Sequence, residues 1–195
     1  FVIIYQYIHL ASTSSVSLPT DLWIPSSIYV KPKFSQQYAV GYFKNLSDNM
    51  YESSIEAYYK NMDQLIEYKE GVLPEDNTNS SSDDAFTSGT GISYGAEFLI
   101  KKTKGKTTGW IGYTLSKTTR YFDEVNSGVD FPAKYDRRHD LAITATHQLS
   151  KAWVLSSVFV YQTGNAITLP TERYIIGGQP YTEFTSRNGF RMEPY

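Results

Sequence analysis

The sequence predicts an all-β fold of antiparallel, up-and-down strands. Three observations predict it. Apolar and polar residues alternate at period two in many segments of the 195-residue chain, short turns alternate with long connections, and aromatic residues make up 15% of the sequence, with 17 tyrosines. Because successive side chains of a strand point to opposite faces, period-two alternation indicates strands rather than helices.

The clearest strands flank the turn at 104–106, which contains a central glycine. One face of the first run is apolar, and it consists of Ile92, Tyr94, Ala96, Phe98 and Ile100. In the second run Ile111, Tyr113 and Leu115 alternate with small or polar residues. A short Gly-centred connection between two such runs predicts a β-hairpin. Each run has about ten residues, which exceeds the usual strand of about five or six and matches the roughly 9–11 residues of a membrane-crossing strand.

Five further segments show strand patterns, at residues 1–8, 36–44, 50–68, 137–149 and 153–162. In 50–68 one face has Tyr51, Ser53, Ile55, Ala57 and Tyr59, and the other has Glu52, Ser54, Glu56, Tyr58 and Lys60. With the central hairpin, these segments predict about seven strands and the beginning of an eighth.

The connections between these strands alternate in length. The short ones lie at 45–49, 104–106 and 150–152, and the long ones at 9–34, 69–89, 120–136 and 164–191. We expect the first to be loop because of its prolines, which cannot donate to a strand ladder. A structureless loop near 20 residues argues against a compact soluble domain but is normal on the outer rim of a bacterial barrel. The pattern therefore predicts a segment of a transmembrane β-barrel with long external loops.

Composition limits the classes of function. The formal net charge is −2, which favours no nucleic-acid partner, and the absence of cysteine excludes disulfides and thiolate metal sites. The mean hydropathy is −0.39, and no apolar run approaches the length of a transmembrane helix. A closed β-barrel is the route across a membrane left to such a chain. The alternative is a soluble β-sandwich that acts as a carbohydrate-binding module, since alternation alone does not separate the two.

The sequence shows no pattern typical of an enzyme. Glu52 and Glu56 share a face, but they lie about 13 Å apart at about 3.3 Å per residue, which is wider than a glycosidase carboxylate pair. His9, His139 and His147 lack the spacing of a zinc site. We expect no catalytic residue, no metal and no cofactor. For the charged cluster 137–140 we expect a solvated strand start with local ion pairs, and the alternative is a ligand contact.

The stronger candidates for ligand binding are aromatic residues in the segments expected to be external loops. Aromatic faces stack on sugars and planar chelates, and packing between loops is the alternative interpretation. The candidates are Trp23, Tyr29, Phe86, Tyr121, Phe122, Tyr181 and Phe184.

Several motifs, taken in order, resemble the late barrel strands of TonB-dependent outer-membrane receptors, especially those carrying a carboxypeptidase-regulatory-like domain. The resemblance covers nearly the whole chain. Its motifs are Leu18–Pro25, Ser93–Glu97, Gly109–Lys117, Phe131–Asp140, Gln148–Trp153, Tyr161–Ala166 and Asn188–Tyr195.

The resemblance implies a location in the bacterial outer membrane and a receptor that imports a siderophore, cobalamin, an oligosaccharide or a peptide. It implies contact with outer-membrane lipid and energy from the TonB complex, which acts through a plug domain; a surface lipoprotein lid is a further partner that the sequence leaves open. We expect residues 1–195 to be part of the barrel domain, without the plug and without the closing C-terminal strands.

Overall fold

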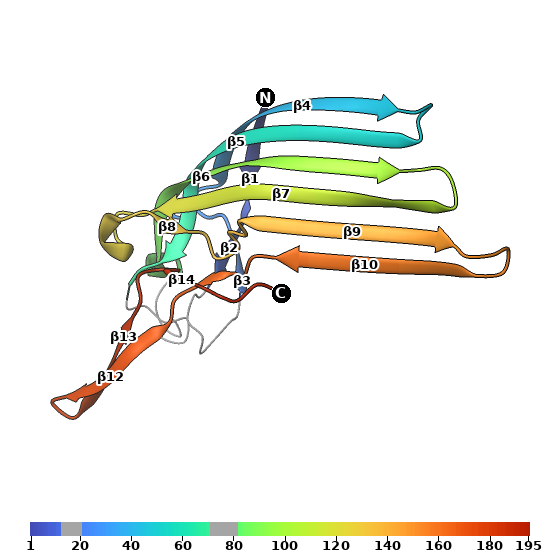
Figure 1. Cartoon of the computed structure of the whole chain (residues 1–195). Helices are drawn as coiled ribbons and strands as arrows, with labels where there is room; N and C mark the ends of the chain where they lie inside the picture. The colour runs from blue at the N-terminus through green and yellow to red at the C-terminus, as the bar shows by residue number, and fades with distance from the viewer. Residues whose placement is uncertain (13–20, 71–81) are drawn as a thin grey trace.

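The computed structural model of this chain describes residues 1–12, 21–70 and 82–195. Its main element is an eight-stranded sheet, in which Figure 1 shows the strands from β4 to β7 with β9 and β10 as long and roughly aligned. The strands, in spatial order, are β1 (Val2–Gln6), β4 (Lys33–Leu46), β5 (Tyr51–Tyr68), β6 (Phe86–Lys102), β7 (Thr107–Tyr121), β9 (His139–Gln148) and β10 (Val154–Gln162), with the short β8 (Phe131–Pro132) beside β7. Every pairing is antiparallel. The prediction of an antiparallel all-β fold is confirmed, and in the described residues β1 and β10 are the unjoined ends of an open sheet.

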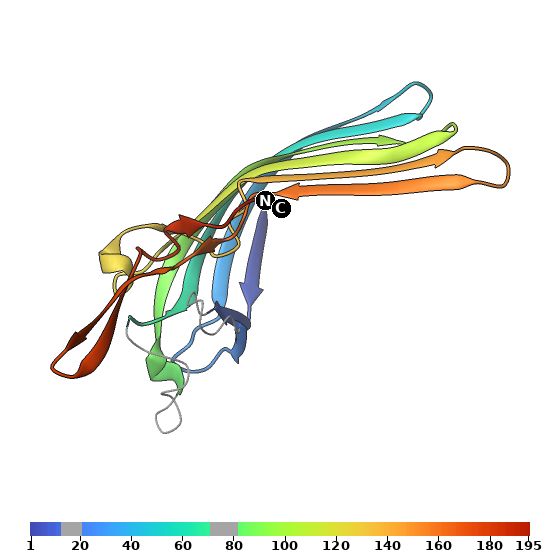
Figure 2. The same cartoon turned by 60° about the horizontal axis from the view of Figure 1, so that its bottom comes forward.

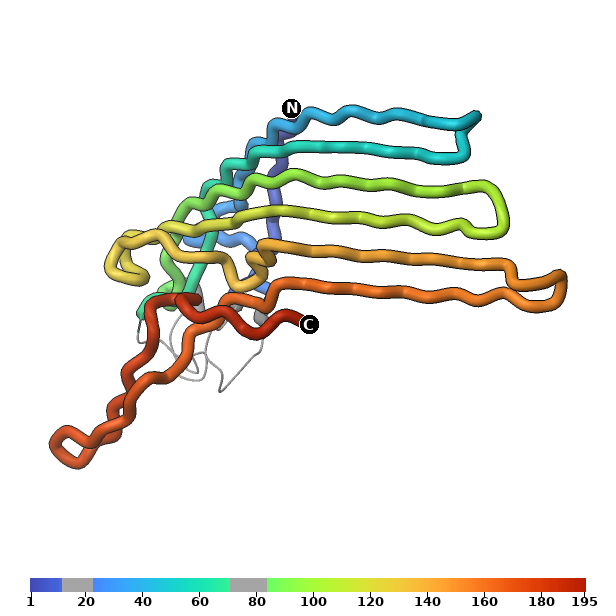
Figure 3. Tube along the Cα trace, in the orientation of Figure 1, coloured from blue at the N-terminus to red at the C-terminus, as the bar shows by residue number. Residues whose placement is uncertain are grey.

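The three long hairpins β4–β5, β6–β7 and β9–β10 extend in the same direction from the rest of the chain. Figure 3 traces their tips to one end of the sheet, whereas the long connections gather at the opposite end. The predicted alternation of short turns and long connections is therefore present. We call these the turn end and the loop end of the sheet.

The long connections contain more strand than the sequence predicts. The connection 9–34 contains β2 (Ile8–Ser12) paired with β3 (Asp21–Pro25), and 164–191 contains β11 (Ala166–Ile167) paired with β14 (Phe190–Arg191) and β12 (Pro170–Ile176) paired with β13 (Gln179–Phe184). The expectation of loop at these residues is wrong. In a sheet of only two strands each strand has an outward edge, so proline is tolerated there.

Element boundaries differ from expectation at the loop end. β6 begins at Phe86 and β7 ends at Tyr121, so both continue into segments expected to be loop. The connection 120–136 also contains the 3-10 turn η3 (Asn126–Gly128) and β8. In the connection 69–89, η2 (Ser82–Ala85) precedes β6, and residues 71–81 lie outside the described part of the chain.

The strand register aligns like residues across the main sheet. We call one side the outer face, because a continuous apolar row crosses it through Tyr42, Ile55, Phe98, Tyr113, Leu141 and Tyr161. The opposite side, the inner face, has a polar row of Gly41, Glu56, Glu97, Thr114, Asp140 and Gln162. The predicted division of 50–68 into two faces therefore holds along most of β5.

Exposure of the two faces is the reverse of that in an ordinary soluble sheet. The outer apolar side chains are largely uncovered, with exposed fractions of 45% for Ile55, 56% for Ile100 and 54% for Phe159. On the inner face Glu56, Ser93 and most of their polar neighbours are half-buried. Figure 2 shows that the sheet is bent. Because a curved single layer crowds side chains on its concave side, we infer that the inner face is the concave one.

The buried core lies at the loop end. On the outer face, the β2–β3 hairpin covers β5 and β6 through a cluster of Ala11, Ile24, Val30, Ile66, Tyr68, Ala85 and Phe86. On the inner face, the segment after β7 covers the same strands through Leu65, Phe122, Val125 and Phe131, with Met62 against them. The remaining length of the sheet is a single layer in the described residues.

A β-bulge separates the covered loop end from the single layer. The register of β5 against β6 shifts between Met62 and Leu65, so that Asp63 and Gln64 together oppose Thr90. Gln64 has φ of 57°, in the left-handed region. The extra residue reverses the phase of β5, because Leu65 then lies opposite Gly89 on the inner face. The bulge decides which face each following residue joins, so that Leu65 packs in the inner cluster and Ile66 in the outer one.

We predict that Gln64→Gly stabilises the fold whereas Gln64→Val destabilises it. A side chain in the left-handed region costs about 1–2 kcal/mol, and Gln64→Gly removes this cost. The greater freedom of glycine in the unfolded chain cancels about 0.5–1 kcal/mol of the stabilisation, which leaves a net gain. The measurement is the midpoint of denaturant unfolding. The matched control is Asn61→Gly, in the regular part of β5, which should lower the midpoint. Shifts of the two glycine variants in the same direction would contradict this account of the bulge.

Candidate functional site

The structure places two of the seven candidate aromatics in the core. Phe86 packs on Tyr68 with ring centroids 4.7 Å apart, and Phe122 stacks on Phe131 at 5.9 Å. Phe122 is fully buried and Phe86 nearly so. Both therefore have a packing role, Phe122 in the segment after β7 and Phe86 as the cross-strand partner of Tyr68.

The other five candidates are exposed but do not form one site. Trp23 lies in β3 and Tyr29 just after it, with exposed fractions of 62% and 78%. Tyr181 and Phe184 belong to the β12–β13 hairpin, which projects from the loop end in Figure 1. Tyr121 is the last residue of β7. These residues give the loop end several separate aromatic surfaces.

A buried ion cluster holds the last long connection against the sheet. The Glu67 side chain on β5 is 3% exposed and pairs with Arg120 of β7 at 3.2 Å and with Arg187 at 2.5 Å. The Nε of Arg187 is buried without a hydrogen-bond partner in the described structure. The cluster therefore fixes the chain near Arg187 to the inner face of β5, although the two segments are far apart in sequence.

A second pair closes the same region. Asp136, with a side chain 2% exposed, accepts hydrogen bonds from the Thr118 amide at 2.6 Å and from Arg191 at 2.6 Å. Arg191 also donates to the carbonyl of Gly164 at 3.0 Å. These contacts tie the end of the 120–136 connection to β7 and to β14.

The charged cluster 137–140 is a hydrogen-bonded strand start. Arg137 donates to the side chains of Gln162 and Asn165, and Asp140 accepts from the amide of Gln162 at 2.6 Å. The His139 Nδ1 lies 2.8 Å from the Tyr113 hydroxyl. In the described residues these partners are amides and hydroxyls, so the expected local ion pairs are replaced by neutral partners.

The three histidines lie apart on different elements. His9 Nε2 lies 3.3 Å from the Ser26 hydroxyl, and His147 Nδ1 lies 2.7 Å from the Thr107 hydroxyl. Burial lowers the pKa of His9 below its ordinary value of 6.5; a backbone hydrogen bond with Lys31 acts against this shift, and the charge of Lys33 adds to it. Among the described residues no three His, Asp or Glu side chains come together as a metal site.

The inner face is mostly polar on β5, β7 and β9, whereas on the flanking strands β4 and β10 it also carries exposed apolar side chains, such as Phe43, Val158 and Val160. Glu56 lies directly opposite Glu97, and Thr114 and Asp140 continue the row on the next two strands. Nearer the turn end, Glu52 pairs with Lys101 at 3.0 Å. The arrangement places hydrogen-bond acceptors and hydroxyls in one row along the inner face.

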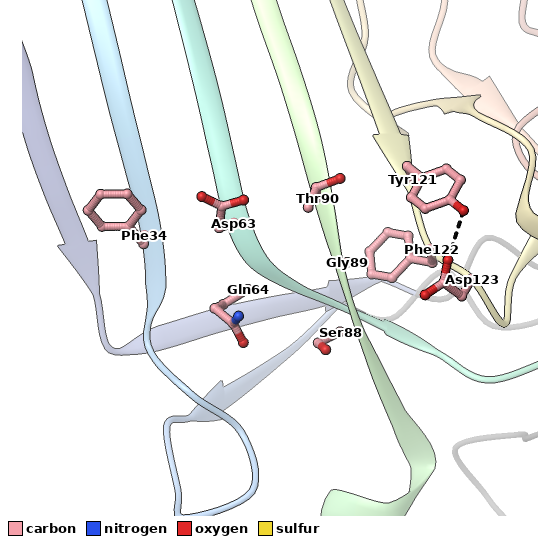
Figure 4. A pocket seen from close by; sticks show the side chains of 9 residues that line it. All are labelled: Phe34, Asp63, Gln64, Ser88, Gly89, Thr90, Tyr121, Phe122 and Asp123. Carbon is pink, nitrogen blue, oxygen red and sulfur yellow. Dashed lines mark hydrogen bonds between the residues drawn. The ribbon is translucent and has the colours of Figure 1, made fainter.

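The outer face has a hollow of about 430 Å³ at the bulge. Figure 4 shows its lining, in which Phe34, Asp63, Thr90 and Tyr121 follow one another across β4, β5, β6 and β7. The remaining lining residues are Gln64, Ser88, Gly89, Phe122 and Asp123.

Two of these nine, Tyr121 and Phe122, were candidates from the sequence. The sequence did not predict the other seven, because the alternation of apolar and polar residues does not reveal the bulge that places Gln64 among them. The Tyr121 hydroxyl donates to Asp123 at 2.8 Å, and this bond raises the pKa of Tyr121.

Comparisons with protein-family models, with curated proteins and with solved structures found no match. No helix within the described residues has the length and hydropathy that crossing a membrane demands.

We predict that Glu67→Gln destabilises the fold by about 3–5 kcal/mol, because it leaves two arginines around a buried site without their counter-charge. The matched control is Glu52→Gln, which breaks a half-exposed pair with Lys101 and should cost at most about 1 kcal/mol. The measurement is the free energy of unfolding of both variants. Equal, small losses would show that the Glu67 cluster is not what holds the last connection in place.

We predict that the β2–β3 hairpin loses stability in mild acid because of His9. A lowered pKa means that the fold favours neutral His9, so this contribution is complete above about pH 6.5 and is lost as the pH falls through the lower folded-state value. His9→Gln should reduce the difference in unfolding midpoint between about pH 7.5 and pH 5. An unchanged difference would contradict this role of His9.

Proposed function

We propose that this chain forms part of the barrel wall of a TonB-dependent outer-membrane receptor in the bacterial outer membrane. The observation that carries the proposal is the reversed exposure of the main sheet, with an uncovered apolar outer face and, on β5, β7 and β9, a half-buried and mostly polar inner face. In a porin-like barrel, apolar residues meet lipid and polar residues line the interior. A soluble β-sandwich requires the opposite, since its apolar face is covered by a second sheet.

The extent of the apolar face supports lipid as its cover. Outer residues of six neighbouring strands contribute to it, from Tyr42 on β4 to Tyr161 on β10. Monomeric soluble proteins rarely expose a continuous apolar patch larger than a few hundred Å². The three two-stranded sheets of the described residues lie at the loop end; β2–β3 covers the outer face there and leaves it open from the bulge to the turn end.

Aromatic side chains border the apolar face at both ends. Near the loop end Tyr38, Tyr59 and Tyr94 lie side by side across three strands. Near the turn end Tyr51 is covered by the Lys102 ammonium, 5.7 Å from the ring centre. Eight residues separate Tyr51 from Tyr59, which is about 26 Å along a strand and roughly 20 Å after tilting, close to the apolar band of about 25 Å in such barrels. A row of tyrosines at one boundary is typical of a membrane-spanning wall, and at the other boundary Tyr51 is, in the described residues, the one aromatic ring of its row, between Leu46 and Lys102.

The proposal accounts for the two ends of the sheet and for its inner face. The long connections with exposed Trp23, Tyr29 and Tyr181 would be external and meet the ligand, and the short turns would be periplasmic. The polar inner face would line the path of the imported solute. The resemblance noted above supplies the ligand classes, namely a siderophore, cobalamin, an oligosaccharide or a peptide, and the TonB complex as the energy source.

Cysteine labelling in the intact cells that make the protein tests this orientation, because the chain has no cysteine of its own. We would place Thr182→Cys in β13 and Ala152→Cys in the turn before β10, both at exposed positions. A membrane-impermeant maleimide should label Thr182→Cys at once and Ala152→Cys only after the outer membrane is opened. Equal labelling of both sites in intact cells would overturn the proposal.

A further inference from the structure

We propose that the hollow at the β5 bulge binds a saccharide ring. The hollow lies on the outer face, because Phe34 and Asp63 oppose each other on β4 and β5 and have the same parity as outer-face residues such as Tyr38 and Tyr59. Its position beside the tyrosine row places it at the membrane boundary. That placement, and a glycolipid headgroup as the source of the sugar, rest on the proposed function.

The polar lining offers hydrogen-bonding groups that the described part of the chain does not use. Asp63, Gln64, Ser88 and Thr90 make no side-chain hydrogen bond or ion pair in the described part of the chain. Together they bring a carboxylate, an amide and two hydroxyls to the lining, and Figure 4 shows Asp63 and Thr90 at one level with Gln64 and Ser88 below them. A carboxylate accepts two hydrogen bonds at once, and an amide or hydroxyl both donates and accepts. This set matches the neighbouring hydroxyl groups of a sugar.

Aromatic rings border the same space. Phe34 lies at one end of the lining and Tyr121 at the other; Phe122 is fully buried and supports the floor without offering a ring face. Tyr121 is held in place by its bond to Asp123, and Phe122 by its stack on Phe131. A sugar ring has an apolar face of C–H groups that packs on aromatic surface, so the hollow combines the two kinds of contact that a saccharide uses.

The backbone at the hollow is strained. Gln64 is a residue other than glycine at φ of 57°, and its side chain belongs to the lining. Gly89 is also constrained, since a Cβ there would lie 2.2 Å from the carbonyl oxygen of Tyr121 and 2.4 Å from the Phe122 ring. Strained residues of this kind concentrate at ligand sites. The bulge therefore both shapes the space and turns a polar side chain into it.

The charge of the lining selects among sugars. Asp63 and Asp123 are its ionisable carboxylates, and no Lys or Arg is among the lining residues. A phosphorylated sugar would bring negative charge against them, whereas a neutral or amino sugar would not. The inferred ligand class is therefore a neutral or amino saccharide.

Saturation-transfer NMR on the purified full chain in detergent tests the site with free glucose, N-acetylglucosamine, glucosamine and glucose 6-phosphate as probes. We expect transfer to at least one of the first three and none to the phosphate. Asp63→Ala and Thr90→Val should each reduce the transfer at least tenfold. The control is Glu172→Ala, an exposed carboxylate on β12, which should leave the transfer unchanged. Absence of transfer, or transfer that survives both hollow variants in the folded protein, would overturn the site.

A second arm identifies the source of the sugar and separates this inference from the proposed function. Native mass spectrometry of the chain released from its own membrane should show a retained glycolipid that Asp63→Ala loses. If free sugar binds through Asp63 but no glycolipid is retained, the source is a soluble saccharide and the headgroup assignment is wrong. If cysteine labelling contradicts the spanning orientation while free sugar still binds, the proposed function fails and the saccharide site stands.

Discussion

The cross-strand register of the main sheet is the constraint on which the rest of this structure depends. Six long strands are aligned so that alternate residues of each strand lie together on one face. A slip of one residue would exchange the two faces of a whole strand. Alignment gathers Ile55, Phe98 and Leu141 into one apolar surface and Glu56, Glu97 and Asp140 into one polar surface. The sheet therefore has two chemically distinct sides without a second layer to define them.

The loop end uses different forces from the long arms. There the bulge at Gln64 reverses the phase of β5, so that Ile66 packs under the β2–β3 hairpin and Leu65 packs on the opposite side. Glu67 and Asp136 then accept arginines from the last connection. Buried charges cost desolvation, and their partners make that cost tolerable. The segment with ordinary protein packing is thus confined to one end, and the single layer begins where it stops.

Much of this arrangement could be predicted from period-two patterns. The hairpins, the division of β5 into faces and the alternation of connection lengths follow from local residue order. The β2–β3 and β12–β13 hairpins could not be predicted, because prolines in a segment indicate a loop unless the partner strand is known. The bulge was also hidden, since nothing in Met62–Leu65 marks which residue is extra. Phe86 and Phe122 show the same limit: burial depends on segments distant in sequence, so a loop aromatic and a core aromatic look alike.

The hollow at the bulge illustrates how function could follow from such an irregularity. Its lining comes mainly from four strands and includes residues that regular strand pairing would not bring together. Because Asp63 and Thr90 are on the outer face, a ligand held there would meet the wall from outside, whereas a transported solute would meet Glu56 and Glu97 from within. The two faces would then serve two separate recognition tasks.

Spin labelling along β5 tests the central claim most directly. Single nitroxides at positions 52 to 60 of the chain in its own membrane would be measured for collision with oxygen, which concentrates in lipid, and with a water-soluble nickel complex. If the outer face meets lipid, oxygen collision should peak at Ser53, Ile55, Ala57 and Tyr59, and nickel collision should peak at the alternate positions. Low collision with both reagents at Ile55 and Ala57 would mean that protein covers that face, as in a soluble sandwich, and would contradict the account.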